Sequence, residues 1–343
     1  MNRYRAPFLG KTKELHEFCV SITDCHHSTP LYLESGKLVI RNYNIKDGRM
    51  LLDNLSFTDD KHFEQRISRD KPLPGDLIIT REAPMGEVCI IPEGLECCLG
   101  QRMVLIKPDL EIINNQFLLY ALMSEYVQEQ INKSNGTGSI VSNLRIPVLK
   151  ELKIPQFKLC TQRKIGRILG NIDAKIKLNN KINTELEAMA KLIYNYWFIQ
   201  FDFPDENGNP YKSSVGKMVY NEDLKRNVPD GWEVRDLKTL LDYNSGHSFS
   251  SKSYCDSGKW KIVTIKSVQE SGFDTSKCDR LISIPQNLDD ECNLEIGDLL
   301  MSLTGNTGRL CFVTESNCLL NQRVAKIWSS ELSNYFIYLY FKR

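Results

Sequence analysis

The sequence has no hydrophobic run approaching the roughly 18 consecutive apolar residues of a membrane helix. Its N-terminal segment also has no apolar core of secretory-signal length. A charge excess is missing as well, since 44 Lys and Arg oppose 43 Asp and Glu for a net charge of +1. Contact with nucleic acid would therefore depend on local basic patches. With 41% hydrophobic and 25% charged residues, the composition predicts a soluble, globular, cytoplasmic protein.

The cysteines lack the spacing of a disulfide framework or a zinc site. There are 11 of them, an odd number, and no pair has CxxC spacing. Cys97 and Cys98 are adjacent, so on a strand their side chains point to opposite faces. These features predict reduced, mostly buried thiols. His26 and His27 have no further ligands at metal-site spacing, so no metal site is predicted.

No catalytic motif is complete in this sequence. A P-loop and an HExxH motif are absent, and Gly136 and Gly138 are not followed by the third glycine of a dinucleotide-binding turn. The tripeptide Asn209-Pro210-Tyr211 lacks the second proline of the motif with which amino-methyltransferases hold a flipped base. We therefore expect a recognition protein, with no catalytic residue and no cofactor bound by this chain.

One sequence pattern occurs twice. Residues 75–86 read GDLIITREAPMG and residues 297–308 read GDLLMSLTGNTG, an offset of 297 − 75 = 222 positions. Each copy continues through an apolar, strand-like stretch to a Gln-Arg pair, at 101–102 and at 322–323. Solenoid repeats are only about 20–50 residues long, so this longer period indicates two copies of one domain.

Both copies are predicted to be rich in β-strands. Strand-like segments in the first copy are 37–45, 76–80, 87–92 and 103–108, separated by Gly, Pro, Asp and Asn. An amphipathic helix is predicted over 115–130, followed by the polar stretch NKSNGTGS. In the second copy, 261–268 occupies the place of 37–45, and 336–342 that of 117–123. The fold class is therefore predicted as α+β, with two β-rich domains.

A long heptad pattern lies between the copies. Its a/d positions alternate in steps of four and three over more than four heptads, which predicts a coiled-coil helix of roughly 40 residues and about 60 Å. Two consecutive positions are asparagine, a residue type that fixes register in coiled coils. The a/d positions are Ile165, Leu169, Ile172, Ile176, Asn179, Asn183, Leu186, Ala190, Ile193 and Trp197, and a second apolar row contains Ile168, Leu178, Ile182 and Met189.

The predicted organisation has four parts. Residues 1–158 form the first domain and 159–200 the helix. Residues 201–229 form a polar, turn-rich linker, and 230–343 form the second domain.

Polar residues in predicted loops are the candidates for DNA contact. Arg and Asn can read guanine and adenine edges, while Ser, Thr and glycine amides can hold phosphates. For Arg102, a structural hydrogen-bond network with Gln101 between strands is an open alternative. The candidates are His27, Ser28, Thr29, Arg41, Asn42, Arg81, Arg102, Asn135, Thr137 and Ser139 in the first copy, and Lys266, Thr304, Asn306, Arg309 and Arg323 in the second.

Several segments together resemble type I restriction–modification specificity subunits. They are GDLIITREAPMGEV with LGQRMVLIKP, NGTGS with IPVLKELKIPQF, QRKIGRILGNIDAKIKLNNKINTELEAMA, and FPDENGNPYKSS. The resemblance implies two target-recognition domains, each binding half of a bipartite DNA site. It also implies two antiparallel spacer helices that dock methyltransferase subunits, with 165–197 as the first. S-adenosylmethionine, ATP and Mg²⁺ are then expected on the methyltransferase and translocase–nuclease subunits, which methylate adenine and cut DNA.

The resemblance leads us to expect that the second domain is incomplete, lacking its terminal loop and second spacer helix. The seam 165–197 would then pair with another copy, a methyltransferase subunit or a fragment encoding the missing part, because so much apolar surface is costly to expose. Two alternatives remain open. One is a half-subunit remnant that dimerises through 165–197 and reads a palindromic site. The other is a coiled-coil scaffold that does not bind DNA.

Overall fold

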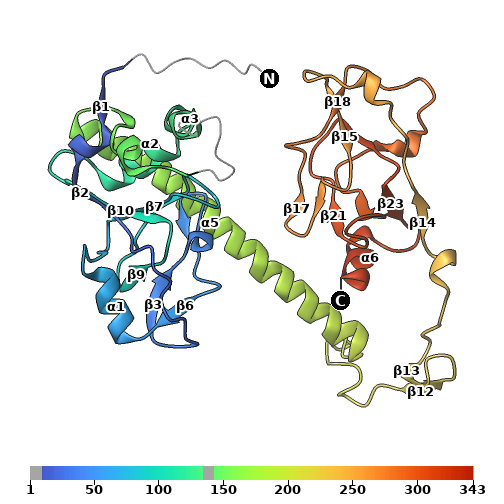
Figure 1. Cartoon of the computed structure of the whole chain (residues 1–343). Helices are drawn as coiled ribbons and strands as arrows, with labels where there is room; N and C mark the ends of the chain where they lie inside the picture. The colour runs from blue at the N-terminus through green and yellow to red at the C-terminus, as the bar shows by residue number, and fades with distance from the viewer. Residues whose placement is uncertain (1–9, 134–142, 343) are drawn as a thin grey trace. The chain divides into compact units, whose positions relative to one another are not determined.

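The computed structural model describes residues 10–133 and 143–342 (Figure 1). The chain divides into two compact units, with the division between Asn179 and Asn180. The described residues up to Asn179 form the first unit, and those from Asn180 onward form the second. Because the division falls inside the long helix α5 (Leu159–Tyr194), each unit contains part of that helix.

The first unit is built on two sheets. The four-stranded sheet has the order β2-β10-β7-β8 and is antiparallel throughout, and the three-stranded sheet has the order β6-β3-β9 with β3 and β9 parallel. Its elements are β1 (Thr12–Glu14), β2 (Cys19–Asp24), β3 (Lys37–Ile40), β4 (Ile45–Lys46), β5 (Arg49–Met50), β6 (Ser56–Thr58), α1 (Asp60–Ile67), β7 (Leu77–Thr80), β8 (Val88–Ile90), β9 (Cys97–Leu99), β10 (Met103–Pro108), α2 (Asn115–Met123), α3 (Glu125–Lys133), α4 (Ile146–Lys150) and β11 (Lys153–Pro155).

Strand β7 shows how this unit forms its core. Its four residues are all buried because both faces of its sheet are covered. Leu77 and Ile79 pack with the helices α2, α3 and α4, whereas Ile78 packs with the three-stranded sheet. The alternation follows from the two-residue period of a strand. It explains why the sequence shows a continuous apolar run here.

The second unit repeats this topology. Its sheets have the orders β14-β23-β20-β21 and β18-β15-β22-β19, again with one parallel pair, β15 and β22. Its elements are β12 (Met218–Asn221), β13 (Arg226–Pro229), β14 (Asp242–Asn244), β15 (Trp260–Val263), β16 (Val268–Gln269), β17 (Gly272–Phe273), β18 (Arg280–Leu281), β19 (Asn293–Leu294), β20 (Leu299–Ser302), β21 (Leu310–Phe312), β22 (Cys318–Leu320), β23 (Val324–Trp328) and α6 (Asn334–Phe341). The α+β fold with two β-rich regions, predicted from the repeat, is confirmed.

The expected helix over 115–130 is two helices, α2 and α3. Ser124 lies between them in an extended conformation, with ψ of 147°. Its hydroxyl donates to the Ala121 carbonyl at 2.6 Å and accepts from the Val127 N–H at 3.4 Å. A serine that ends one helix and caps the next competes with the continuous helix, as serine side chains commonly do.

The segment expected to be a linker has defined structure. Strands β12 and β13 pair as a hairpin over residues 218–229. Phe203, before the hairpin, stacks on Tyr211 at 4.8 Å and on Trp232, after the hairpin, at 5.5 Å between ring centroids. These aromatic residues explain the folding of a stretch whose polar composition suggested a linker.

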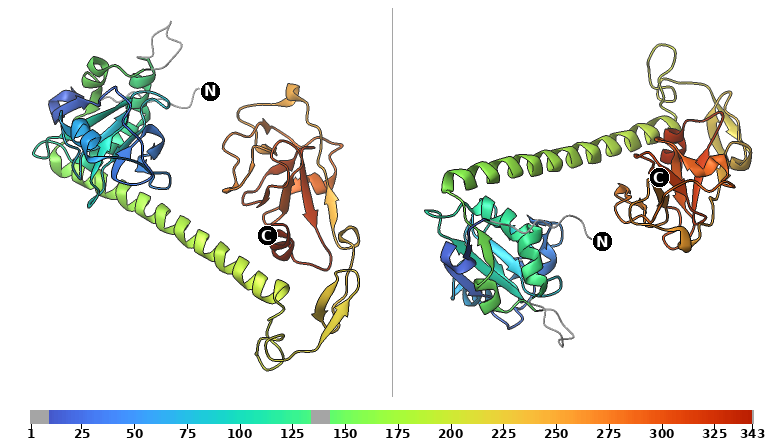
Figure 2. Two further views of the ribbon diagram at one scale, coloured as in Figure 1. Left: turned by 60° about the horizontal axis from the view of Figure 1, so that its bottom comes forward. Right: turned by 90° about the horizontal axis from the view of Figure 1, so that it is seen from above.

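Helix α5 is continuous from Leu159 to Tyr194 (Figure 2). A π-helical turn over Asn195–Ile199 follows it. At 1.5 Å per residue, 36 helical residues give a length of about 54 Å. Within the described residues, no helix combines the length and apolar character needed to cross a membrane.

Candidate nucleic-acid interface

The strand ends of the first unit bring several loops to one edge. Because β3 and β9 run parallel, Ile40 and Leu99 end at the same place, and the Gly100 N–H donates to the Ile40 carbonyl at 2.7 Å. The loops after β7 and before β10 join them, since the Arg81 N–H donates to the Arg102 carbonyl at 2.8 Å. We call residues 24–29, 41–44, 81–86, 100–102 and 143–144 the first loop cluster.

Arg81 is the most firmly held side chain in this cluster. Its Nη1 lies 3.0 and 2.9 Å from the two carboxylate oxygens of Asp24. Its Nε donates to the Leu144 carbonyl at 3.0 Å, and Nη2 lies 3.3 Å from the Asn143 amide oxygen. Only 12% of the side chain is exposed. The geometry gives Arg81 an internal role, tying the loop after β7 to β2 and to residues 143–144.

Gln101 and Arg102 each contact a neighbouring loop. The amide of Gln101 donates to the His27 carbonyl, and Arg102 Nε lies 3.2 Å from Glu82 Oε2. Arg102 has a φ of 66°, in the left-handed region that side chains other than Gly rarely adopt. Its guanidinium is nevertheless more than half exposed. It is therefore both positioned by the framework and accessible.

The residues after β2 are held by the neighbouring loops. His27 is exposed and its Nε2 lies 3.1 Å from Asp24 Oδ2. The Ser28 carbonyl accepts from the buried Arg66 guanidinium, and Thr29 is exposed. Burial, together with the cationic Arg69 and Arg66, lowers the pKa of the neighbouring His26, which favours its neutral form. These residues thus present hydroxyl and imidazole groups on a fixed backbone.

Arg41 and Asn42 lie at the end of β3. The Arg41 guanidinium carbon is 4.7 Å from the ring centroid of Tyr32 and 4.8 Å from that of Tyr43. Asn42 Nδ2 donates to the Ala83 carbonyl at 2.5 Å, joining this loop to the loop after β7. The first loop cluster therefore contains seven of the ten candidates in this unit. The other three, Asn135, Thr137 and Ser139, lie outside the described residues.

The second unit forms an equivalent second loop cluster, residues 247–250, 264–267, 303–309 and 321–323. Its candidates lie in these loops. Lys266, Thr304, Asn306 and Arg323 are exposed, whereas Arg309 is half-buried and its Nη1 lies 3.3 Å from Gln269 Oε1. The Asn321 N–H donates to the Val263 carbonyl at 3.1 Å, so the loops meet as they do in the first cluster.

The two clusters share a backbone framework. The Leu303 N–H donates to the Arg323 carbonyl at 3.0 Å, matching the bond from Arg81 to Arg102. Ala83 and Gly305, which are 305 − 83 = 222 positions apart, both have positive φ, 46° and 74°. What differs is the set of side chains that the framework carries. Leu303 stands where Arg81 forms its ion pair, so the framework is retained while the side chains at the loop tips change.

The structure also contains features that the sequence did not reveal. The pairing of Arg81 with Asp24 and the contacts of Arg41 with Tyr32 join residues from different loops, so no local spacing signals them. Among the described residues, no group of three or more His, Cys, Asp or Glu could hold a metal ion. The cysteines are free thiols, and burial raises the pKa of Cys97 to about 12.

The predicted coiled-coil seam on α5 is largely uncovered. Ile172 is 51% exposed and Ile176 is 44% exposed, although both are isoleucines at a/d positions. Ile165 packs against the hydrophobic core of the first unit, and Asn179 and Asn183 are exposed polar positions. The apolar seam residues that are substantially exposed are Leu169, Ile172, Ile176, Leu186, Ile193 and Trp197.

The start of α5 packs on helix α2 within the first unit. Tyr120 donates to Asp173 at 2.7 Å, and Gln162 Oε1 accepts from the Asn114 N–H at 2.8 Å. Burial and this bond to Asp173 raise the pKa of Tyr120 to about 12. The contact covers the face of α2 that carries Asn114, Gln116 and Tyr120.

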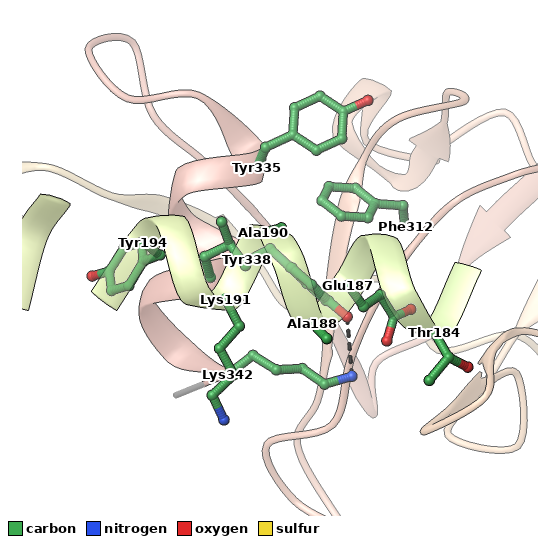
Figure 3. Close-up of a pocket in the computed structure, with 11 residues that line it drawn as sticks. Thr184, Glu187, Ala188, Ala190, Lys191, Tyr194, Phe312, Tyr335, Tyr338 and Lys342 are labelled. Carbon is green, nitrogen blue, oxygen red and sulfur yellow. Dashed lines mark hydrogen bonds between the residues drawn. The ribbon is translucent and has the colours of Figure 1, made fainter. Parts of the chain in front are cut away.

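The equivalent face of α6, in the second unit, lines an open groove (Figure 3). Helix α6 matches α2, since Asn115 Nδ2 donates to Gly75 O and Asn334 Nδ2 to Gly297 O, both at 3.2 Å. The groove has a volume of about 500 Å³ and lies between α6, Phe312 and the turns of α5 from Thr184 to Tyr194. Tyr335, at the position of Gln116, is 70% exposed.

Comparison with known proteins identifies the family. The model of the type I restriction modification DNA specificity domain matches residues 38–188 and 229–343. The chain therefore belongs to this family.

Two curated relatives are specificity subunits. The type I restriction enzyme MjaIX specificity subunit of Methanocaldococcus jannaschii is 30% identical over 193 residues, 56% of this chain and 42% of that protein. The HindI specificity subunit of Haemophilus influenzae is 26% identical over 176 residues, 47% of this chain and 38% of that protein. The matched part thus spans less than half the length of these relatives.

A solved structure shows the same fold. The crystal structure of the type-I restriction-modification system S subunit from M. genitalium superposes with a TM-score of 0.54 at 16% identity. The match covers 99% of this chain and 78% of that one.

Proposed function

We propose that this chain is the DNA-recognition subunit of a type I restriction–modification complex. Each β-rich region, 1–158 and 230–343, would contact one half of a bipartite site through its loop cluster. The observation that carries the proposal is the retained backbone framework with different exposed side chains in the two clusters. Two domains that share a backbone framework but differ in their loop side chains suit a DNA site with two different halves.

The chemistry would belong to partner subunits. We expect a methyltransferase subunit to bind S-adenosylmethionine and methylate adenine after extruding it from the duplex. A translocase–nuclease subunit would use ATP and Mg²⁺. This chain would supply the position on DNA, and its net charge of +1 leads us to expect weak, salt-sensitive binding outside the complex.

The apolar seam of α5 is the proposed partner surface. Exposed isoleucines at successive a/d positions favour pairing with another helix. That helix would come from another copy or from a methyltransferase subunit. The groove beside α6 supports this proposal, because the equivalent face of α2 is already covered by a helix. Light scattering at micromolar concentration tests it, and a stable 39.5 kDa monomer with every partner present would contradict it.

Deleting the gene in its host tests the proposed function. Methylation-aware sequencing should find a bipartite adenine-methylated motif in the parent strain and lose that motif in the deletion strain. Restoring the gene should restore the same motif. A motif that persists after deletion would contradict the proposal, and a palindromic motif would favour the dimerising half-subunit.

A further inference from the structure

Arg41 differs from the other arginines of the first loop cluster in how it is held. Arg81 is committed to Asp24, and Arg102 Nε lies 3.2 Å from Glu82 Oε2. Arg41 instead contacts two aromatic rings, Tyr32 at 4.7 Å and Tyr43 at 4.8 Å. A cation–π contact of this kind uses no lone-pair acceptor, so it does not commit the N–H donors of the guanidinium as an ion pair with a carboxylate does. Among the described residues, no carboxylate forms an ion pair with it.

The backbone below Arg41 is fixed. Its N–H donates to the Asn44 amide oxygen at 3.0 Å, and Asn44 is itself buried and bonded to the carbonyls of Leu51 and Asn54 at 3.1 and 3.0 Å. The Tyr43 hydroxyl lies 2.9 Å from Ser56 Oγ, which positions one of the two rings. A planar group with five N–H donors is thus presented from a rigid support.

The second unit has the same support with different chemistry. Ile40 matches Val263 in the two frameworks, so Arg41 matches Thr264 and Tyr43 matches Lys266. The Thr264 N–H lies 3.3 Å from Ser267 Oγ, and Ser267 is buried as Asn44 is. A position that keeps its backbone bond but exchanges Arg and Tyr for Thr and Lys has the property expected of a specificity determinant.

We propose that Arg41, held against Tyr32 and Tyr43, reads a guanine in the half-site bound by the first unit. Arginine recognises guanine through paired hydrogen bonds to O6 and N7, a contact that needs a planar fork in a defined orientation. Tyr32 and Tyr43 are positioning residues in this arrangement. The inference rests on the proposed function and adds the base class that one residue selects.

The test uses the complete complex in its host, with the methylated motif as the readout. Arg41→Lys keeps the charge and loses the fork, so we expect one G of one half-site to become degenerate while the other half is unchanged. Discrimination at that position should fall roughly 5- to 150-fold, the usual value of one bidentate contact. Lys61→Ala is the matched control, because it removes an exposed cation of α1 outside the cluster.

A second pair of variants tests the positioning. Tyr43→Leu should relax the same position, whereas Tyr43→Phe should retain most of the selectivity, because the ring that contacts Arg41 remains and only the hydroxyl bond to Ser56 is lost. Melting curves of the purified variants show whether each one folds. If Arg41→Lys does not fold, the comparison of Tyr43→Leu with Tyr43→Phe decides the outcome.

Different results separate the two proposals. Uniformly weaker methylation of an unchanged motif in Arg41→Lys would make Arg41 a phosphate contact and overturn the reading of guanine. An unchanged motif with unchanged methylation, or a folded variant that methylates nothing, would also overturn it. Failure of the proposed function looks different, because the motif would then persist when the whole gene is deleted.

Discussion

At the scale of single residues, the structure divides the candidate arginines by what occupies their donors. The sequence predicts loops at both Arg81 and Arg41 and makes the two residues equal candidates for DNA contact. Asp24 lies 57 positions from Arg81, so no local pattern could reveal their ion pair. Loop composition predicted where the cluster lies. It could not distinguish a side chain that holds the loops together, such as Arg81, from one whose donors remain available for DNA, such as Arg41.

Replacing Arg81 should therefore act on stability. Arg81→Ala leaves Asp24, which is only 22% exposed, without its main partner. We expect the free energy of unfolding of the first unit to fall by about 2–4 kcal/mol, because a largely buried charge loses a strong ion pair. Urea-induced unfolding, monitored by hydrogen exchange of the amides in β7 and β10, measures the loss of unfolding free energy.

The exposed ion pair of Lys133 with Glu129 gives the control. Lys133→Ala should change stability by only a few tenths of a kcal/mol, the usual value of such an i,i+4 pair. If Arg81→Ala is equally mild, the ion pair with Asp24 is not holding the loops together.

At the scale of elements, the heptad pattern predicted α5 well because a/d spacing is a local property of the chain. The division of the helix over 115–130 was missed because one serine decides it through its own backbone bonds. Gly166 and Gly170 were visible near the start of the helix, yet their role depends on α2. An ideal Cβ at Gly166 would lie 2.7 Å from Asn114 Oδ1 and 3.2 Å from the Phe117 nitrogen.

The same substitution at these two glycines should have opposite effects. Alanine raises helix propensity by about 1 kcal/mol at either position. At Gly166 it meets the cap of α2, in which Asn114 Oδ1 accepts from the Phe117 N–H at 3.0 Å, so we expect a net destabilisation of about 1–2 kcal/mol. At Gly170 it meets only the Gln116 amide, 3.0 Å away at the end of a flexible side chain.

Gly170→Ala should consequently be neutral or stabilising by up to about 1 kcal/mol. Thermal and urea unfolding of the two variants give the comparison directly. Equal changes of the same sign would mean that α2 does not constrain α5 more tightly at one position than at the other.

At the scale of the whole molecule, the repeat alone predicts the fold class, because GD, G and QR recur with nearly the same offset. These residues were informative since they make the backbone bonds of both clusters, such as those of Gly86 and Gly308 to the carbonyls of Thr80 and Ser302, each 2.9 Å. The target sequence was not predictable in the same way. It depends on side chains that the two units do not share.

The length of α5 leads to the last prediction. If the helix sets the distance between the two half-sites, inserting a second copy of residues 176–182 adds one heptad, about 10.5 Å. That is about three base pairs of B-DNA, and the helix turns by only about 20° relative to its seam. Methylation-aware sequencing should find both half-sites unchanged and the spacer longer by about three base pairs.

A five-residue insertion at the same place is the matched control. It adds a similar length but rotates the following residues by roughly 140°, given 3.6 residues per turn. The seam is then split between two faces of the helix, so the partner helix cannot follow it, and we expect methylation to be lost. An unchanged spacer in the heptad variant would show that something other than α5 sets the separation of the half-sites.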